Sequence, residues 1–192
     1  MFPRILSASA ARHLKAHLRR GGLVAYPTES SYGLGCLPTS PHALRRLMQA
    51  DSLTAALQAT GADLRVQVAF QGETVQLWPG EDLGGRAFHV RQVWLLLDET
   101  PVVWARSVCR QIAAEWQNIL ACGTRPLGKQ LFGTGLAWQR SPLAFAAVPI
   151  AQQPQAARAA WLRRSEFALH GEKMVLTEGF APELEQFLPN AG

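Results

Sequence analysis

The sequence predicts an α+β fold in which an antiparallel β-sheet carries helices, and three observations support this prediction. Several segments alternate apolar and polar residues, a pattern typical of strands with one buried face. Short turns join consecutive segments of this kind, so neighbouring strands should run antiparallel. Helical stretches with suitable start and stop signals lie between them. With 192 residues, 48% of them hydrophobic and 17% charged, the chain can bury a core.

The strands of the predicted sheet lie mainly in the second and third quarters of the chain and at its end. Residues 64–70 have a half-buried pattern, and residues 87–97 and 101–109 flank a turn at Asp98-Glu99-Thr100. Residues 165–170 and 173–180 are predicted to form a closing hairpin. Its expected loop is Gly171-Glu172, and a glycine in first place favours a type II′ turn. Shorter strands are expected at 23–26, where Pro27 follows, and at 143–150.

Helices are predicted where apolar residues recur at helical spacing. Ser40-Pro41 is a good helix start, because serine can cap the helix and proline suits its first position. A loop is expected around Pro126-Leu127-Gly128. The other expected helices span residues 10–20, 52–60, 111–121 and 156–162.

The basic charge of the chain is concentrated at its start. The pI is about 9.6, but residues 1–50 hold seven basic and one acidic side chains, whereas residues 51–192 hold twelve basic and thirteen acidic ones. The body therefore lacks the basic surface expected of a nucleic-acid-binding protein, and no nucleic-acid partner is predicted.

Three cysteines (Cys36, Cys109 and Cys122) form neither a C-x-x-C motif nor a set with histidines at metal-ligand spacing. Neither structural zinc nor a disulfide framework is predicted, and a reducing compartment fits this pattern. No apolar run reaches the ~18 residues that a membrane-spanning helix requires. We therefore expect a cytoplasmic, soluble protein without a metal or redox cofactor.

Two charged residues stand on strand faces that are otherwise apolar. Arg91 alternates with Val93 and Leu95, and Glu178 follows Met174 and Leu176 at the same spacing. Burying a charge is unfavourable unless a partner or a ligand compensates it. One interpretation is a structural ion pair between Arg91 and Glu178, or exposure of one of them at a sheet edge. The other is that the two side chains line a binding site.

Four ordered segments resemble the chorismate lyases of ubiquinone biosynthesis over about residues 41–188. They are Asp51-Ser52-Leu53-Thr54, Val90-Arg91-Gln92-Val93, the run from Arg125 to Phe132 (RPLGKQLF), and Arg163-Arg164-Ser165 with the hairpin ending in Val175-Leu176-Thr177-Glu178. The resemblance implies an antiparallel sheet with helices that enclose a buried ligand cavity. It also implies the conversion of chorismate to 4-hydroxybenzoate and pyruvate, with no cofactor, in a protein expected to be a monomer.

The resemblance assigns roles to four positions. Arg91 matches the arginine that binds the ring carboxylate, and Glu178 matches the glutamate that meets the oxygen at the opposite end of the ring. Leu127 matches a loop leucine near the ligand. Val68, also assigned to substrate binding, stands where bacterial members have methionine; this departure is compatible with a main-chain contact to the ligand but not with the methionine's side-chain contact. Arg106 and Arg164 also have counterparts, for which a solvated or structural role is expected.

The two charges on apolar strand faces also lead to a hypothesis about the geometry of the site, if both line one cavity. Arg91 and Glu178 should lie on facing strands, separated by a gap that fits a benzenoid ring, without touching each other. A guanidinium suits a carboxylate because its donors form a planar fork. Glu178 could supply a proton or a hydrogen bond at the oxygen that departs with the pyruvyl group.

The first forty residues resemble a different family. The run from Gly21 to Cys36 (GGLVAYPTESSYGLGC) is similar to the opening of a YrdC-type threonylcarbamoyl-AMP synthase. The Lys-x-Arg segment that binds phosphate in that family is missing, so residues 1–40 are interpreted as a peripheral fused remnant and residues 41–192 as the lyase-like domain. Two alternatives to the lyase stay open: a small-molecule-sensing domain of the same fold, and a truncated synthase.

Overall fold

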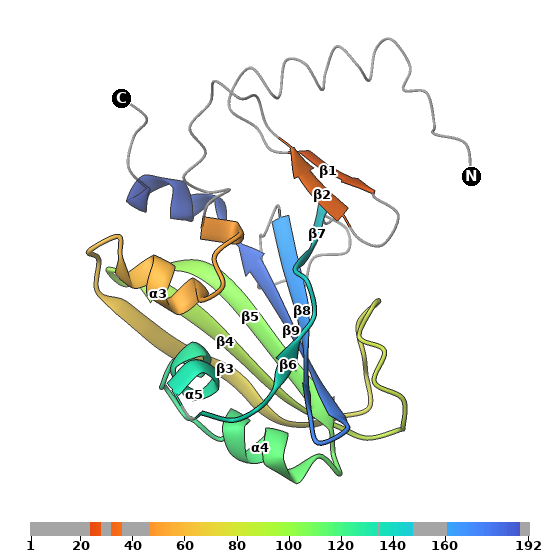
Figure 1. The fold of residues 1–192 in the computed structure, drawn as a ribbon. Helices are drawn as coiled ribbons and strands as arrows, with labels where there is room; N and C mark the ends of the chain where they lie inside the picture. Colours follow the sequence, from red (N-terminus) through yellow and green to blue (C-terminus); the bar gives the residue numbers. More distant parts are fainter. Residues whose placement is uncertain (1–23, 28–31, 36–46, 134, 148–160, 189–192) are drawn as a thin grey trace.

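The computed structural model describes residues 24–27, 32–35, 47–133, 135–147 and 161–188 (Figure 1). The described strands are β1 (Val24–Pro27), β2 (Tyr32–Gly35), β3 (Leu64–Thr74), β4 (Phe88–Leu97), β5 (Thr100–Arg110), β6 (Gln139–Arg140), β7 (Ala144–Ala147), β8 (Trp161–Leu169) and β9 (Glu172–Phe180). The described helices are α3 (Leu53–Gln58), α4 (Ala114–Leu120), α5 (Leu127–Gly133) and the 3₁₀ helix η2 (Pro182–Phe187). Leu47 and Met48 are also helical, and both are buried.

A seven-stranded antiparallel sheet forms the body of the protein. Its strands follow the order β3-β4-β5-β9-β8-β6, and β7 also pairs with β8. Helices α3, α4 and α5 lie over one face of this sheet, as Figure 1 shows. The predicted α+β class and antiparallel sheet are therefore confirmed.

The predicted turn between β4 and β5 is present, with Thr100 already in the strand. Leu97 pairs with Thr100, so Asp98 and Glu99 form a two-residue loop. Both loop residues have positive φ, 45° and 66°, as a type I′ turn requires. The amide of Asp63 donates to Asp98 Oδ1 at 2.8 Å and ties the start of β3 to this turn.

The closing hairpin is present, but its loop lies one residue earlier than predicted. Leu169 pairs with Glu172, so His170 and Gly171 form the loop, and their φ values of 48° and 82° make a type I′ rather than a type II′ turn. Two contacts from other elements keep Glu172 in β9. Arg110 forms an ion pair with its carboxylate, and Trp116 Nε1 donates to its carbonyl oxygen at 3.0 Å.

The alternation predicted for residues 64–70 holds for only part of β3. Val66 is buried, but Val68 is 37% and Phe70 46% exposed. A register shift between Val68 and Phe70 moves the pairing from Val93 to the adjacent Gln92, so Phe70 turns to the other face of the sheet. Because β3 is an edge strand, its outer residues have a neighbouring strand on one side only.

Helix α3 agrees with the prediction for residues 52–60, and Ser52 Oγ accepts a hydrogen bond from the Ala55 amide as the N-cap. The segment predicted as a loop at 126–128 instead begins helix α5. Gly128 allows α5 to approach α3, because a Cβ there would lie 2.9 Å from Thr54 Oγ1. Without a side chain at this position, the two helices form one wall over the sheet.

Several predicted elements lie partly or wholly outside the described residues. The helix at 10–20 and the helix start at Ser40-Pro41 do so entirely. The strand expected at 143–150 is β7, described as far as Ala147. Of the helix expected at 156–162, the two described residues, Trp161 and Leu162, instead begin β8. The strand expected at 23–26 is β1, which includes Pro27 and pairs with β2.

The main hydrophobic core lies between the sheet and the helices. Among its largest members are Met48, Trp116 and Phe167, each at most 1% exposed. A smaller cluster of Phe88, Val90, Val108 and Val175 is packed against Leu77 and Leu83. Several members of this core, among them Val93 and Leu176, also line a pocket.

Candidate active site

The sheet register brings Arg91 and Glu178 to the same face. Arg91 pairs with Ser107, and Glu178 pairs with Ala105, two residues away on β5. The two charged residues are therefore separated by two strand spacings across the sheet and by two residues along the strands. This corresponds to about 12 Å between their Cα atoms. The prediction of facing strands was wrong, because β4 and β9 are the two neighbours of β5 in one sheet.

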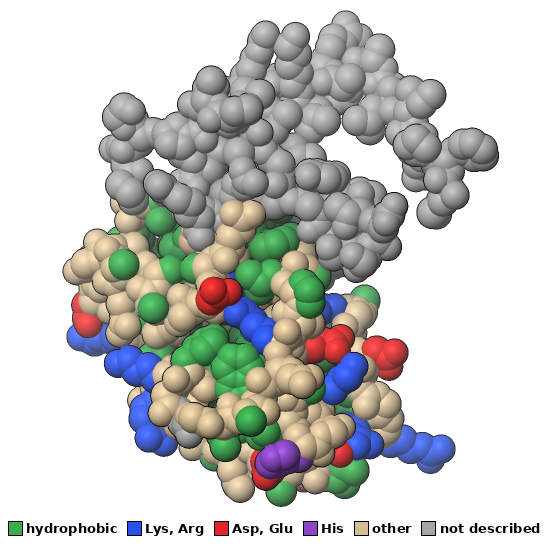
Figure 2. All heavy atoms as spheres, viewed as in Figure 1, with side chains coloured by type: hydrophobic (Ala, Val, Ile, Leu, Met, Phe, Trp, Pro, Cys, Tyr) green, Lys and Arg blue, Asp and Glu red, His purple; other side chains and the backbone are tan. Residues whose placement is uncertain are grey.

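A pocket lies between this sheet face, helix α5 and the segment from Asp51 to Thr54. Arg91, Glu178 and Leu127 all line it, as the sequence predicted for a common site. Figure 2 shows hydrophobic and basic side chains together at the middle of this face of the molecule. Val68 is not among the lining residues, whereas Val66 and Leu53 are. Val68 precedes the register shift of the edge strand, and its side chain is partly exposed.

Arg91 is a buried cation whose described partners are neutral. The residue is 2% exposed. Its Nη2 donates to the carbonyl oxygens of Gly123 at 2.7 Å and Arg125 at 3.3 Å, both in the segment before α5. Its Nε is buried and has no acceptor among the described residues. Burial lowers the pKa of Arg91, and the neighbouring Cys122 acts in the opposite direction.

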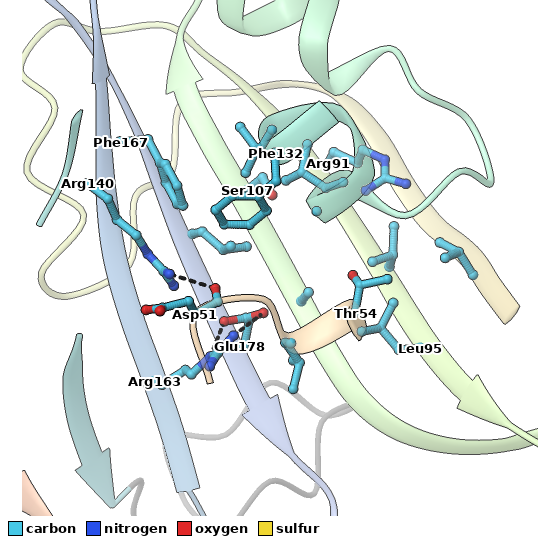
Figure 3. A pocket seen from close by; sticks show the side chains of 18 residues that line it. Asp51, Thr54, Arg91, Leu95, Ser107, Phe132, Arg140, Arg163, Phe167 and Glu178 are labelled. Carbon is cyan, nitrogen blue, oxygen red and sulfur yellow. Dashed lines mark hydrogen bonds and ion pairs between the residues drawn. The ribbon is translucent and has the colours of Figure 1, made fainter. Parts of the chain in front are cut away.

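Glu178 has a protein partner that the sequence reasoning missed. Arg163 on β8 forms a buried ion pair with it: Arg163 Nε donates to Glu178 Oε2, and Nη2 donates to Oε1 at 3.2 Å. Arg163 Nη1 also donates to the carbonyl oxygens of Met48 at 2.9 Å and Ala50 at 2.8 Å. The guanidinium therefore joins the sheet to the segment that leads into α3, and it fixes the Glu178 carboxylate (Figure 3).

The structural ion pair between Arg91 and Glu178 is not formed. The described hydrogen bonds and ion pairs of Arg91 do not include Glu178, and Figure 3 shows Arg91 apart from the Arg163–Glu178 pair. Ala105 and Ser107 lie between them on β5, and both line the pocket. Because these two side chains are small, they leave space in the pocket between the two charged groups.

Arg140 on β6 is a third arginine of this pocket. Its side chain extends past the Phe167 ring, 5.2 Å from the ring centroid, and its Nη1 donates to the Asp51 carbonyl oxygen at 2.7 Å. Burial lowers the pKa of Arg140, and the nearby Arg163 lowers it further. No sequence pattern marks Arg140, because β6 has only two residues and no periodic alternation.

The two other arginines singled out in the sequence have structural partners. Arg106 forms a buried ion pair with Glu81, with Nε 2.8 Å from Oε1. Arg164 donates from Nε to Thr177 Oγ1 at 2.9 Å and from Nη1 to the Pro79 carbonyl oxygen at 2.8 Å. Neither lines the pocket. Within the described residues, no group of three or more histidine, cysteine or acidic side chains could hold a metal ion.

Replacing Arg163 with methionine is expected to destabilise the protein by roughly 3–5 kcal/mol, because Glu178 would remain as an uncompensated buried charge. The additional change Glu178→Leu should recover most of that loss, since it removes the stranded carboxylate. Urea unfolding of the single and double variants measures both effects.

The matched control is Arg110→Met, which breaks a partly exposed ion pair with Glu172. It should lower the free energy of unfolding by about 1 kcal/mol or less. Equal losses for Arg163→Met and Arg110→Met would contradict the assigned role of Arg163.

A protein-family model described as chorismate lyase matches residues 36–186. A probable chorismate pyruvate-lyase from Ralstonia nicotianae is 34% identical over 191 residues, covering 88% of this chain and 97% of that protein. These matches confirm the resemblance of the main part of the chain.

A second relative matches the beginning of the chain. A threonylcarbamoyl-AMP synthase from Neisseria meningitidis serogroup B is 66% identical over 47 residues, which make up 24% of this chain. The chain spans only 25% of the length of that synthase.

A crystal structure described as the possible transcriptional regulator YydK from Bacillus subtilis superposes with a TM-score of 0.44 at 13% identity. The superposition covers 97% of this chain and 84% of that one. In the part of the chain that the structure describes, no helix is both long and apolar enough to cross a membrane.

Proposed function

Because the chain belongs to the chorismate lyase family of carbon–oxygen lyases, we propose that it converts chorismate to 4-hydroxybenzoate and pyruvate, as the first step of ubiquinone biosynthesis. One observation carries the proposal. Arg91 is a buried guanidinium whose described partners are two carbonyl oxygens, in the same pocket as a rigidly held carboxylate. A buried cation of this kind is most stable when an anionic ligand completes its hydrogen bonds.

The arrangement suits the two ends of the chorismate ring. The ring carboxylate at C1 would accept hydrogen bonds from Arg91, and the hydroxyl group at C4, across the ring, would meet Glu178. Ala105 and Ser107 leave the space between these two anchors for the ring itself. The apolar walls come from residues such as Leu53, Leu127 and Phe132. Such a wall excludes water from the ring and strengthens the polar contacts at its ends.

The reaction breaks the ether bond between ring C3 and the enolpyruvyl oxygen. C4 loses its hydrogen, the ring becomes aromatic, and the ether oxygen becomes the keto oxygen of pyruvate, whose methylene carbon gains a hydrogen to become methyl. Atoms therefore balance without an added reactant. Aromatisation supplies the driving force, so the protein has to hold the reactive conformer and accommodate the charge that develops at the departing oxygen.

The Arg163–Glu178 pair determines how Glu178 can act. Arg163 occupies one acceptor position on each carboxylate oxygen, and a carboxylate can accept further hydrogen bonds on both. Glu178 is thus able to accept a hydrogen bond from the C4 hydroxyl of the substrate while it remains paired. Because Arg163 also binds two backbone carbonyls, the carboxylate is already in position before the substrate arrives.

The proposal is tested by ¹H NMR of the purified protein with chorismate, in parallel with its variant Arg91→Met. The parent protein should release 4-hydroxybenzoate and pyruvate in a one-to-one ratio. Arg91→Met should weaken 4-hydroxybenzoate binding by about 2–5 kcal/mol, because it removes a buried partner of the carboxylate. Calorimetric titration measures this loss.

The control for Arg91→Met is Arg86→Met, at an exposed arginine shortly before β4. This control should bind 4-hydroxybenzoate and turn over chorismate like the parent. A folded parent protein that releases neither product would overturn the proposed function. Unchanged product binding by Arg91→Met would remove Arg91 from the site.

We also propose that the protein acts as a monomer in the cytoplasm and binds no nucleic acid. The two described cysteines, Cys109 and Cys122, are buried free thiols, which suits a reducing compartment. Burial raises the pKa of Cys109 to about 12, so this thiol resists conversion to the reactive thiolate. The excess of basic over acidic side chains lies in the first fifty residues, because residues 51–192 hold twelve basic and thirteen acidic ones.

For residues 1–40 we propose a peripheral remnant of a synthase-like segment that makes no part of the lyase site. The short identity with one quarter of a synthase supports this proposal. In the described chain, β1 and β2 form a two-stranded sheet of their own, which lies beside β7.

Limited proteolysis should therefore cut first before residue 41 and leave a fragment that still binds 4-hydroxybenzoate with the affinity of the whole chain. Mass spectrometry of the fragments locates the first cut, and titration of the purified fragment measures its affinity. A first cut between residues 60 and 180, or loss of binding on removal of the N-terminal segment, would show that this segment is integral to the domain.

A further inference from the structure

Near Glu178 the pocket has more arginine side chains than are needed to pair with this one carboxylate. Arg163 and Arg140 both line that end, and Glu178 is the only buried acid there among the described residues. Asp51 also lines the pocket, but its residue is exposed, so water screens its charge. One guanidinium is therefore left without a buried counter-charge beside the position proposed for C4 of the ring.

Arg163 is not that guanidinium, because Glu178 is its buried counter-charge and each of its three nitrogens already donates to a described acceptor. Nε and Nη2 bind Glu178, and Nη1 binds two carbonyl oxygens. Arg140 has a different environment. One of its nitrogens binds the Asp51 carbonyl oxygen, and its Nε is buried without an acceptor among the described residues. Figure 3 shows Arg140 lying along Phe167 and reaching toward the Arg163–Glu178 pair.

We infer that Arg140 forms a second carboxylate subsite, which binds the carboxylate of the enolpyruvyl group of chorismate. This inference rests on the proposed function. With the ring held at C1 by Arg91 and at C4 by Glu178, the enolpyruvyl ether at C3 lies next to the Glu178 end. A planar guanidinium with a free N–H is suited to a carboxylate at this place.

The exposure of the two arginines also indicates how the substrate lies in the pocket. Arg140 is partly exposed and contacts the exposed Asp51, whereas Arg91 is almost fully buried. The enolpyruvyl group therefore lies at the outer part of the pocket and the ring carboxylate at the inner part.

The test compares substrate and product, because only chorismate carries the second carboxylate. Arg140→Gln should raise the KM for chorismate about 10- to 100-fold, the equivalent of a lost charge-assisted hydrogen bond. It should change kcat little, since the carboxylate is bound equally before and during the reaction. The Kd of 4-hydroxybenzoate should stay within about twofold, as expected for independent contacts. Arg140→Lys should recover part of the lost affinity because it keeps the charge.

Arg65→Gln is the matched control, because Arg65 is an exposed arginine on β3 whose ion pairs with Asp63 and Glu99 are at the surface. It should leave KM, kcat and Kd unchanged, and thermal unfolding of each variant checks its folded state. If Arg140→Gln weakens 4-hydroxybenzoate as much as chorismate, or raises KM no more than Arg65→Gln does, the subsite is overturned while the lyase function stands. If the parent protein forms no product, the proposed function fails and the subsite with it.

Discussion

The buried ion pair between Arg163 and Glu178 is the interaction on which the site depends. It joins two neighbouring strands, and through the carbonyls of Met48 and Ala50 it also fixes the segment that leads into α3. A buried pair of this kind contributes little net stability compared with apolar packing, but losing one partner is strongly destabilising. The role of the pair is to position the carboxylate of Glu178. It holds a carboxylate at the base of a pocket in a single orientation, so that a ligand meets an organised polar group.

Arg91 is compensated in a different way. Its guanidinium donates hydrogen bonds to two neutral carbonyl oxygens, and its buried Nε–H has no acceptor among the described residues. This arrangement leaves unsatisfied hydrogen-bonding capacity in the apo protein, which an anionic ligand would use. In this pocket the charge of Arg163 is paired with Glu178. Arg91 and Arg140 donate only to carbonyl oxygens among the described residues, and each has a buried Nε–H without an acceptor there. That asymmetry matches a dianionic substrate better than a neutral one.

The sequence predicted the architecture well where local patterns determine it. The strands around Arg91 and Glu178, the helix capped by Ser52 and the antiparallel connections all follow from period, capping and turn residues. The predictions were wrong where contacts between distant segments determine the structure. Placing the hairpin loop at Gly171-Glu172 would pair Arg163 with Phe180, whereas the actual loop at His170-Gly171 pairs it with Glu178. A shift of one residue in the loop therefore hid the partner of Glu178, and the resemblance alone did not reveal it.

The register shift in β3 and the two-residue strand β6 account for the other differences. No periodic signal marks a bulge, so Phe70 was expected on the wrong face, and no signal marks Arg140 as a pocket residue. These positions depend on how separate strands align, which a single sequence does not encode locally.

The most direct measurement of the site is a crystal structure of the protein with 4-hydroxybenzoate. The account predicts one molecule in this pocket, with its carboxylate on Arg91 and its phenolic oxygen on Glu178, while Arg163 keeps its bonds to Glu178. A ligand bound elsewhere, or bound with its carboxylate at the Glu178 end, would contradict it.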